Sequence, residues 1–423
     1  MIPTLPPPKC QSGGSVERLF LALPCKWVTI GRYTEGMDCI RGLKRGRQFR
    51  AQFIRLLLAI TVVGLCTGSA LSAARMPDGS QCVPAFPLKA PWLGADAAYS
   101  IPLPDGRSVW IFGDTLYGDK RVVNGKDPRI VRNSIGISSC TNGKWNLEYV
   151  IRHNGEGAWQ DFFQAQHKDT WYWALDGFVH GDDLWVTLLC IRKASSPKPD
   201  AFDFETCGAD LAKVSGLNGD PQKWKVEYFP MVNDGVAAYP SATTVVSGDY
   251  VYLFALYEKG NRPMLLTRIP LGGLSDPARN MQYYSKSGAW KPGFTPADSM
   301  AVMEPGATEM TVRYHPELKK WLAVFKSPDL STDQVLARTA AQISGPWSQG
   351  KVIYHVPEMK RGSPGFSKDT FCYAGKEHPE FRTPESILFT YVCNTADVPS
   401  IATNSDIYFP KVVRVPLLEL MNP

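Results

Sequence analysis

The sequence of 423 residues lacks the patterns that mark several common protein classes. It contains no Cys-x-x-Cys pair, and its six histidines are scattered, so no residues have the spacing of metal ligands. Helical periodicity is almost missing after the N-terminal segment, which argues against a helical bundle or an α/β fold. No WD, Kelch or Asp-box signature is present. We therefore expect no metal and no cofactor, and a structural calcium is not indicated.

The main part of the chain also lacks an excess of charge of one sign. The formal net charge is +6, but residues 1–74 hold ten Lys and Arg against three Asp and Glu, and the other 349 residues hold 36 against 37. Proteins that bind nucleic acid need clustered positive charge, so nucleic acid is not an expected partner. A nearly neutral body suits a neutral substrate such as a polysaccharide or oligosaccharide. We expect a monomer.

The N-terminal segment has the order of an export signal. A basic stretch precedes the apolar run 56–66, and small residues follow up to Ala74. We expect residues 37–74 to be a signal peptide cleaved after Ala74 or, because the run is long, an uncleaved membrane anchor. Residues 1–36 have no globular pattern, and Met37 is the expected start. The protein is thus expected to be secreted or periplasmic, with no membrane contact beyond this segment.

One pattern recurs five times at intervals of roughly sixty residues: an apolar strand, a tight turn and an aromatic-rich strand. The copies span residues 96–114, 171–190, 238–257, 308–326 and 371–394. A unit repeated in this way cannot bury both of its faces alone, so the copies must pack against one another.

Each copy continues into further strands. In the first unit we expect strands at 97–103, 108–112, 134–139 and 145–151, which form an antiparallel meander. Outer strands of the later units are expected at 224–229, 281–285, 352–356 and 412–417. Four strands in each of five units predict an all-β, five-bladed β-propeller over residues 75–423. The alternative, a pair of β-sandwich domains, does not explain five equal periods.

Cysteine usage agrees with export. Six cysteines follow the N-terminal segment, an even number that allows fifteen pairings. We expect Cys190–Cys207 and Cys372–Cys393, each inside one repeat, and Cys82–Cys140 as the tie between the entry segment and the first repeat. The alternative is that some of the six are buried free thiols.

Two aspartates break the repeat pattern. Asp96 begins the first strand of unit one, which should line the central channel, and Asp114 ends the strand paired with it, so both should lie at one channel mouth. Two such carboxyl groups fit a glycoside hydrolase, in which one donates a proton and the other is nucleophile or base. The poorly solvating Gly-Ala-Asp-Ala-Ala stretch favours Asp96 as the acid, and the Thr115 hydroxyl could hold Asp114 ionised. Each aspartate could instead be a turn cap.

Aromatic and polar residues fall near the same channel mouth. Sugar rings stack on aromatic planes, so such residues suit a saccharide cleft. The candidate substrate-binding residues are Trp92, Tyr99, Asn133, Trp171, Trp173, Tyr239, Glu309, Tyr373 and His378. The alternative for at least half of the aromatic residues is packing between blades. Glu309 could pair with Arg313, His378 could be a turn residue, and Asp176 is expected to be structural.

The stretch WLGADAAYSIPLPDGRSVWIFGDTLYG, followed by RNSIGI, resembles the first blade of the endo-D-arabinanases of glycoside hydrolase family 183, long described only as a domain of unknown function. The similarity continues through GPWS at 345–348 and HPE…LFTYVCN in unit five, and covers most of residues 85–420.

This resemblance implies that Asp96 and Asp114 are the catalytic pair. It also implies endo-cleavage of α-linked D-arabinofuranose chains such as bacterial cell-wall arabinan. An insertion at 193–205 departs from the family pattern. The resemblance therefore predicts the type of reaction better than the identity of the sugar. The alternative function is a secreted, lectin-like carbohydrate-binding propeller without turnover.

Overall fold

The computed structural model describes residues 82–121, 129–196, 203–364 and 366–421. The expected signal or anchor segment and the expected start at Met37 lie outside these residues. Within the described ranges, no helix is long and apolar enough to span a bilayer.

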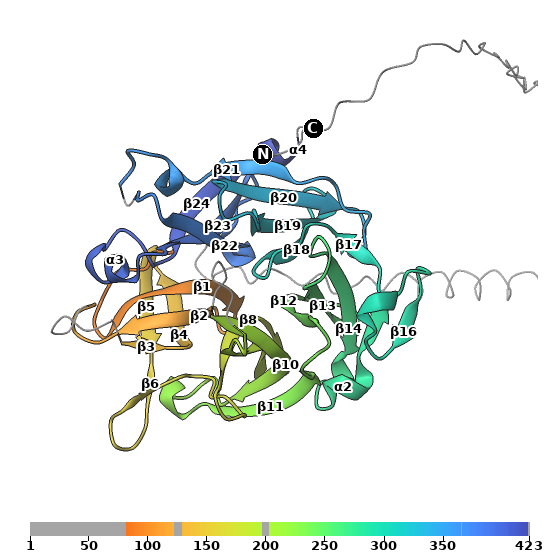
Figure 1. Ribbon diagram of the computed structural model, residues 1–423, viewed down its shortest axis with the longest axis horizontal. Coiled ribbons are helices and arrows are strands. Elements are labelled where there is room, and N and C mark those ends of the chain that lie inside the picture. The colour runs from red at the N-terminus through yellow and green to blue at the C-terminus, as the bar shows by residue number, and fades with distance from the viewer. Residues whose placement is uncertain (1–81, 122–128, 197–202, 365, 422–423) are drawn as a thin grey trace, which may run out of the picture. The chain divides into compact units, whose positions relative to one another are not determined.

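Five antiparallel sheets form the blades of a β-propeller, which confirms the predicted fold class (Figure 1). Blade one contains β1 (Trp92–Pro102), β2 (Ser108–Tyr117), β3 (Ile130–Val131), β4 (Ser134–Thr141) and β5 (Lys144–Val150). Blade two contains β8 (Thr170–His180), β9 (Asp183–Lys193), β10 (Phe204–Ser215) and β11 (Lys225–Val232). A two-stranded sheet, β6 (Arg152–His153) and β7 (Trp159–Gln160), lies between them in the sequence.

The other three blades follow in chain order. Blade three contains β12 (Ala238–Ser247), β13 (Tyr250–Tyr257), β14 (Met264–Pro270), β15 (Gln282–Tyr284), β16 (Trp290–Pro292) and β17 (Ala301–Met303), with helix α2 (Pro277–Asn280). Blade four contains β18 (Thr311–His315), β19 (Lys320–Lys326), β20 (Gln334–Ala340) and β21 (Lys351–His355). Blade five contains β22 (Thr370–Glu377), β23 (Ser386–Thr395) and β24 (Lys411–Pro416), with helices α3 (Val398–Thr403) and α4 (Leu417–Met421).

The number of strands per blade differs from the expected four. In the described residues blade one has five strands, blade three six and blade five three. The extra strands are short: β3 pairs with β2, while β15 and β16 form a hairpin at the outer edge of blade three. The five-fold repeat is therefore carried by the inner hairpins, and the outer strands vary.

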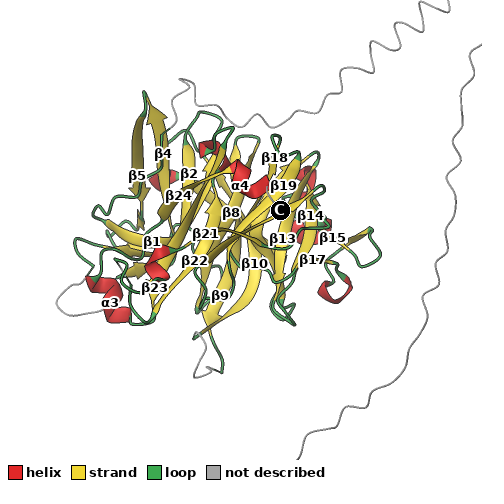
Figure 2. Ribbon diagram, turned by 90° about the horizontal axis from the view of Figure 1, so that it is seen from above, coloured by secondary structure: helices red, strands yellow, loops and turns green. Residues whose placement is uncertain are grey.

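The inner strands close the propeller into a ring. β1 contacts β8, β8 contacts β12, β12 contacts β18, β18 contacts β22, and β22 contacts β1. Figure 1 shows these five strands next to the centre of the molecule, with later strands of each blade farther out, and Figure 2 shows the sheets turned by 90°. Segments far apart in the sequence thus meet around one axis.

Residue patterns explain which strands are inner and which are outer. β9, with the sequence DLWVTLLCIRK, is buried over eight consecutive residues because neighbouring blades cover both of its faces. In β5 (KWNLEYV) exposed and half-buried residues alternate, as expected where one face meets solvent.

Disulfides stabilise individual blades, and a buried arginine joins two of them. The three expected disulfides are present: Cys82–Cys140, Cys190–Cys207 and Cys372–Cys393. Arg121, which follows β2, donates hydrogen bonds to four backbone carbonyls, three of which belong to the segment between β23 and β24. Blade one is thereby tied to blade five, where the ring closes. Three disulfides also indicate that the described part forms in an oxidising compartment.

Candidate active site

A cavity of about 460 Å³ lies at one end of the ring of inner strands. Its lining includes the carboxyl groups of Asp96, Asp114 and Glu309. A cavity of this volume is large enough to hold an oligosaccharide segment or a drug-sized ligand.

Asp96 and Asp114 face one another because of an irregularity in the β1–β2 hairpin. Ala95 pairs with Thr115 and Ala97 pairs with Phe112, so Asp96 alone lies opposite two residues of β2, Gly113 and Asp114. The backbone is strained at this bulge, since Ala97 and Ala98 have φ angles of 63° and 69°. Gly113 is required beside it, because a Cβ atom there would lie 2.3 Å from Asp96 Oδ1.

The same kind of irregularity occurs in most of the inner strands. Register shifts interrupt β8 between Ala174 and Gly177, β12 between Tyr239 and Thr243, and β22 between Tyr373 and Lys376. Bulges of this kind re-aim side chains and are common beside active sites. Here the bulges interrupt the alternation of side chains between the two faces of each strand at the point where the strands reach the cavity.

Asp96 has a neutral hydrogen-bond donor. The Tyr373 hydroxyl donates to Asp96 Oδ2 at 2.7 Å. Burial raises the pKa of Asp96 well above its ordinary value, Asp114 and Glu309 raise it further, and Tyr373 and Lys376 oppose the shift. The surroundings of Asp96 therefore favour its protonated form.

Asp114 has a cationic partner. Arg132 Nη1 lies 3.1 Å from Asp114 Oδ2, and its guanidinium stacks over the Trp171 ring with 4.5 Å to the ring centroid. Burial raises the pKa of Asp114 to about 6, while Arg132 and the Trp173 indole lower it. Arg132 thus favours the ionised form of Asp114, whereas Asp96 has no cation in direct contact. The expected partner of Asp114, the Thr115 hydroxyl, instead contacts Gly113 O and Ser134 Oγ, both at 2.8 Å.

Glu309 pairs with a buried lysine rather than with Arg313. Lys376 Nζ donates to Glu309 Oε1 at 2.7 Å, whereas Arg313 forms its ion pair with Asp176 at 3.0 Å. Asp176 is fully buried in this pair, as expected for a structural residue.

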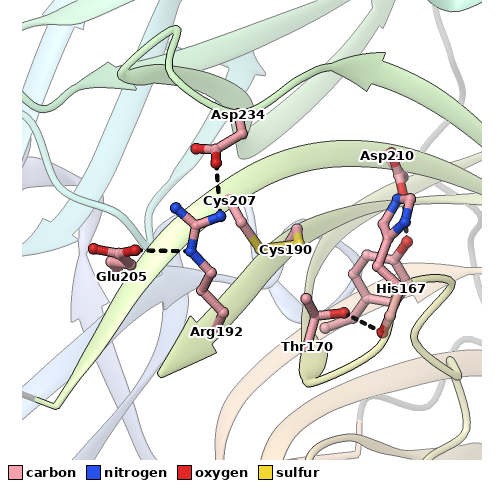
Figure 3. Close-up of a disulfide and its surroundings, with 9 residues drawn as sticks. His167, Thr170, Cys190, Arg192, Glu205, Cys207, Asp210 and Asp234 are labelled. Carbon is pink, nitrogen blue, oxygen red and sulfur yellow. Dashed lines mark hydrogen bonds and ion pairs between the residues drawn. A yellow bond between two sulfur atoms is a disulfide. The ribbon is translucent and has the colours of Figure 1, made fainter. Parts of the chain in front are cut away.

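Aromatic side chains form a further part of the cavity wall. Trp173, Phe204, Phe371 and Tyr373 all line it, and Trp173 and Phe204 pack edge to face with ring centroids 4.7 Å apart. Phe204 begins β10, close to the Cys190–Cys207 disulfide that joins β9 to β10 (Figure 3).

An ion-pair group surrounds this disulfide. Arg192 Nε lies 2.7 Å from Glu205 Oε1, and Arg192 Nη1 lies 2.6 Å from Asp234 Oδ2 (Figure 3). The disulfide and these ion pairs hold the end of the β9–β10 hairpin that carries Phe204.

Of the nine residues expected to bind substrate, the structure brings Trp173, Glu309 and Tyr373 to the cavity. Trp171 reaches the site indirectly, through its stacking with Arg132.

Four of the others are core residues. Trp92 stacks on Tyr149 and is fully buried, and the Tyr99 hydroxyl donates to Ala242 O at 2.8 Å. Tyr239 is 5% exposed and does not line the cavity. Asn133 donates to the Phe163 and Tyr172 carbonyls at 3.1 and 3.0 Å. These side chains point into interblade packing, which their positions along the strand did not reveal.

His378 is the fifth residue outside the cavity. It is fully buried, its Nδ1 lies 2.7 Å from Ser100 Oγ and its Nε2 lies 2.8 Å from Thr390 Oγ1. Burial lowers the pKa of His378 well below its usual value, and Lys376 and Arg313 lower it further. His378 is a neutral bridge between blades rather than a surface turn residue.

Several residues that line the cavity were not among those predicted from the sequence. They are Phe204, Arg262, Thr308, Lys326, Phe371, Asn394 and Tyr408. Phe204 is the first residue of β10 and Tyr408 lies in the irregular segment before β24, so no periodicity points to a channel position for either residue. Within the described part of the chain, no three His, Cys, Asp or Glu residues are grouped so that they could hold a metal ion.

Comparison with known proteins identifies relatives of the whole propeller. The sequence profile of the family described as "Domain of unknown function (DUF5005)" matches residues 86–417. Notoamide biosynthesis cluster protein J' of Aspergillus versicolor is 22% identical over 323 residues, which cover 72% of this chain and 82% of that protein.

Solved structures share the fold. A Bacteroides ovatus protein described as a suspected hydrolase superposes with a TM-score of 0.61 at 17% identity, over 77% of this chain and 86% of that one. An exo-β-1,3-galactanase of Phanerochaete chrysosporium, solved with β-1,3-galactotriose, gives a TM-score of 0.43 at 12% identity, over 77% of this chain and 60% of that one. At these identities the likeness concerns the fold.

Proposed function

This chain belongs to the family described as a domain of unknown function, DUF5005, and we propose that it is a glycoside hydrolase whose catalytic pair is Asp96 and Asp114. The family description names no activity, and the chemistry of the cavity is what supports a hydrolase.

The observation that carries the proposal is the unequal environment of two carboxyl groups in one cavity. Asp114 has an arginine at 3.1 Å, whereas Asp96 has a tyrosine hydroxyl at 2.7 Å. Such a difference drives the two pKa values apart, which is what a general acid and its ionised partner require. A lectin has no need to keep one of two paired carboxyl groups protonated.

In the proposed reaction, Asp96 donates its proton to the glycosidic oxygen as the bond from that oxygen to the anomeric carbon breaks. Asp114, held ionised by Arg132, either attacks the anomeric carbon or removes a proton from the attacking water. If Asp114 attacks, water then hydrolyses the covalent intermediate and gives its proton to Asp96. If Asp114 instead acts as base, it keeps the proton of the water, and exchange with solvent removes that proton and returns one to Asp96. In both cases one water molecule is consumed and its hydroxyl group ends on the anomeric carbon.

The proposed substrate is a furanoside polysaccharide, and the first candidate is bacterial cell-wall arabinan cut at internal α-D-arabinofuranosyl linkages. The likeness of the first-blade sequence to endo-D-arabinanases supports this choice. The five aromatic side chains in the cavity wall, among them Trp173 and Tyr373, suit the stacking of sugar rings. The Bacteroides ovatus protein of the same fold, described as a suspected hydrolase, agrees with the reaction class. An exported protein would meet such a substrate outside the cell.

The test is release of reducing ends from arabinan, arabinogalactan, levan and xylan by the unmodified protein and by Asp96→Asn and Asp114→Asn. Each substitution should lower the rate about 10²–10⁴-fold on the substrate that is cleaved. Asp182→Asn, a change in the exposed turn between β8 and β9, is the matched control and should retain full activity.

Binding of the same polysaccharides by affinity electrophoresis separates the two functions. Equal binding by all variants with no release by the unmodified protein would establish the lectin. Release that survives both substitutions would place the reaction at other residues.

A further inference from the structure

Lys376, in β22, is a fully buried cation that the proposed reaction does not use. Its side chain is 0% exposed, and its Nζ donates to Glu309 Oε1 at 2.7 Å and to the Ala374 carbonyl at 3.2 Å. The ammonium also lies over the Tyr99 ring, 4.5 Å from the centroid. A lysine is rarely buried this completely without a specific partner, because the loss of hydration must be offset.

The carboxyl groups of the cavity outnumber the cations that contact them. Arg132 pairs with Asp114 and Lys376 pairs with Glu309. Asp96 is left with a neutral partner, the Tyr373 hydroxyl. One carboxyl group of the three therefore lacks a neutralising cation, and it is the one that must hold a proton.

The groups that face Asp96 come from four parts of the chain. They are Asp114 from β2, Glu309 from the loop before β18, Tyr373 and Lys376 from β22, and Tyr408 from the segment before β24. Lys376 in turn faces Tyr99, Asp176 and Glu309. Glu309 and Lys376 act on Asp96 in opposite directions, so removing either charge alone leaves the other uncompensated.

We propose that Lys376 is a positioning residue that fixes Glu309 in an ion pair and so reserves the proton of the cavity for Asp96. This inference rests on the proposed role of Asp96 as the proton donor. Without Lys376, the Glu309 carboxyl group would compete with Asp96 for that proton. Without Glu309, the uncompensated ammonium group of Lys376 would act on Asp96.

The test compares Glu309→Gln with the double variant Glu309→Gln/Lys376→Met in the full chain. Glu309→Gln leaves the ammonium uncompensated, so Asp96 should lose its proton at lower pH, and the alkaline limb of the rate profile should move down by about one unit. The double variant restores the charge balance, and its limb should return to the original position. Asp298→Asn, which breaks the exposed pair with Lys291 at 2.8 Å, is the matched control and should not move the limb.

A second measurement needs no substrate. The side-chain carbon of Asp96 is followed by NMR in protein labelled with ¹³C-aspartate, and its signal is assigned by its loss in Asp96→Asn. A lower titration midpoint in Glu309→Gln that returns in the double variant supports the inference. A midpoint that stays unchanged in Glu309→Gln, or that is still lowered in the double variant, overturns it.

The two measurements also separate this inference from the proposed function. If the midpoints move as expected but no polysaccharide is cleaved, the role of Lys376 in setting the proton of Asp96 stands and the hydrolase assignment falls. If cleavage depends on Asp96 while the midpoints do not move, the hydrolase stands and the role of Lys376 is refuted.

Discussion

Blades one and two both place aspartates on their inner hairpins, but in opposite environments. Asp176 in β8 is 0% exposed and accepts hydrogen bonds from Arg313, from a threonine hydroxyl at 2.6 Å and from the Thr244 amide at 2.9 Å. Asp96 in β1 faces a cavity and accepts one hydrogen bond from Tyr373. A buried carboxylate that accepts hydrogen bonds from several donors stabilises the fold. A carboxyl group that has few hydrogen-bond donors and faces a cavity tends to keep its proton and is available for chemistry.

The largest expected difference is in stability. Asp176→Ala leaves the Arg313 guanidinium buried beside no carboxylate, which should cost about 3–5 kcal/mol of unfolding free energy. Asp96→Ala removes a buried acid without a cationic partner and should cost much less. Urea unfolding followed by tryptophan fluorescence measures both, and equal losses would contradict the distinction between the two aspartates.

A geometric change should affect activity without a similar loss of stability. Gly113→Ala places a Cβ atom 2.3 Å from Asp96 Oδ1 and must displace that carboxyl group. A displacement of about 1 Å should lower kcat about 10²-fold, with a small change in Tm because a side-chain end can move. Gly155→Ala is the control, since no atom lies within 4 Å of its added Cβ. Full activity of Gly113→Ala would show that the placement of Asp96 is not critical.

The pH dependence of stability should distinguish the blades as well. Because burial raises the pKa of Asp114 to about 6, the folded state binds more protons than the unfolded chain between about pH 4 and pH 6. This contribution makes stability fall as the pH rises through that window.

Asp114→Asn should therefore flatten the slope and raise the unfolding free energy at pH 7 by about 2 kcal/mol. Urea unfolding at pH 4, 5, 6 and 7 measures the slope. A variant with the original slope, or with lower stability at pH 7, would refute the raised pKa.

The smallest expected effect is on KM and concerns the cavity wall, to which blade two contributes aromatic side chains rather than carboxyl groups. Phe204→Ala removes a ring that lines the cavity and packs against Trp173, and should raise KM about tenfold at unchanged kcat, since one aromatic contact contributes about 0.5–1.5 kcal/mol. Phe229→Ala in β11 removes a half-buried ring of the same blade outside the cavity, and its KM should not change. A fall in kcat for Phe204→Ala would show that the ring positions the reacting groups.

The inner hairpins and the pair of aspartates could be predicted from the sequence. Pairing of β1 with β2 around the Pro-Asp-Gly turn follows from local chemistry, and it brings Asp96 opposite Asp114 wherever the hairpin lies. The Cys372–Cys393 disulfide follows for the same reason, because the two cysteines occupy facing positions of one hairpin.

Other expectations failed where contacts between blades decide the outcome. Trp92 and Tyr99 are aromatic residues of β1 like true wall residues of other inner strands, but Trp92 is buried against Phe112 and Tyr149, and the Tyr99 hydroxyl donates to Ala242 O of blade three. Lys376 lies in an ordinary strand sequence, FCYAGKEHPE, in which nothing marks a buried cation. The same holds for Arg132, whose partner and stacking surface come from two different blades.

Local sequence was thus sufficient for the five hairpins, their turns, the two cysteine pairs within a repeat and the meeting of two carboxyl groups, because each depends on residues within one repeat. Ring closure brought Lys376 to Glu309 and the Tyr373 hydroxyl group to Asp96, whereas the Arg132 that pairs with Asp114 belongs to the same blade. Charges act through space, and apart from Asp114 the side chains that act on Asp96 lie more than two hundred residues away along the chain, on blades four and five.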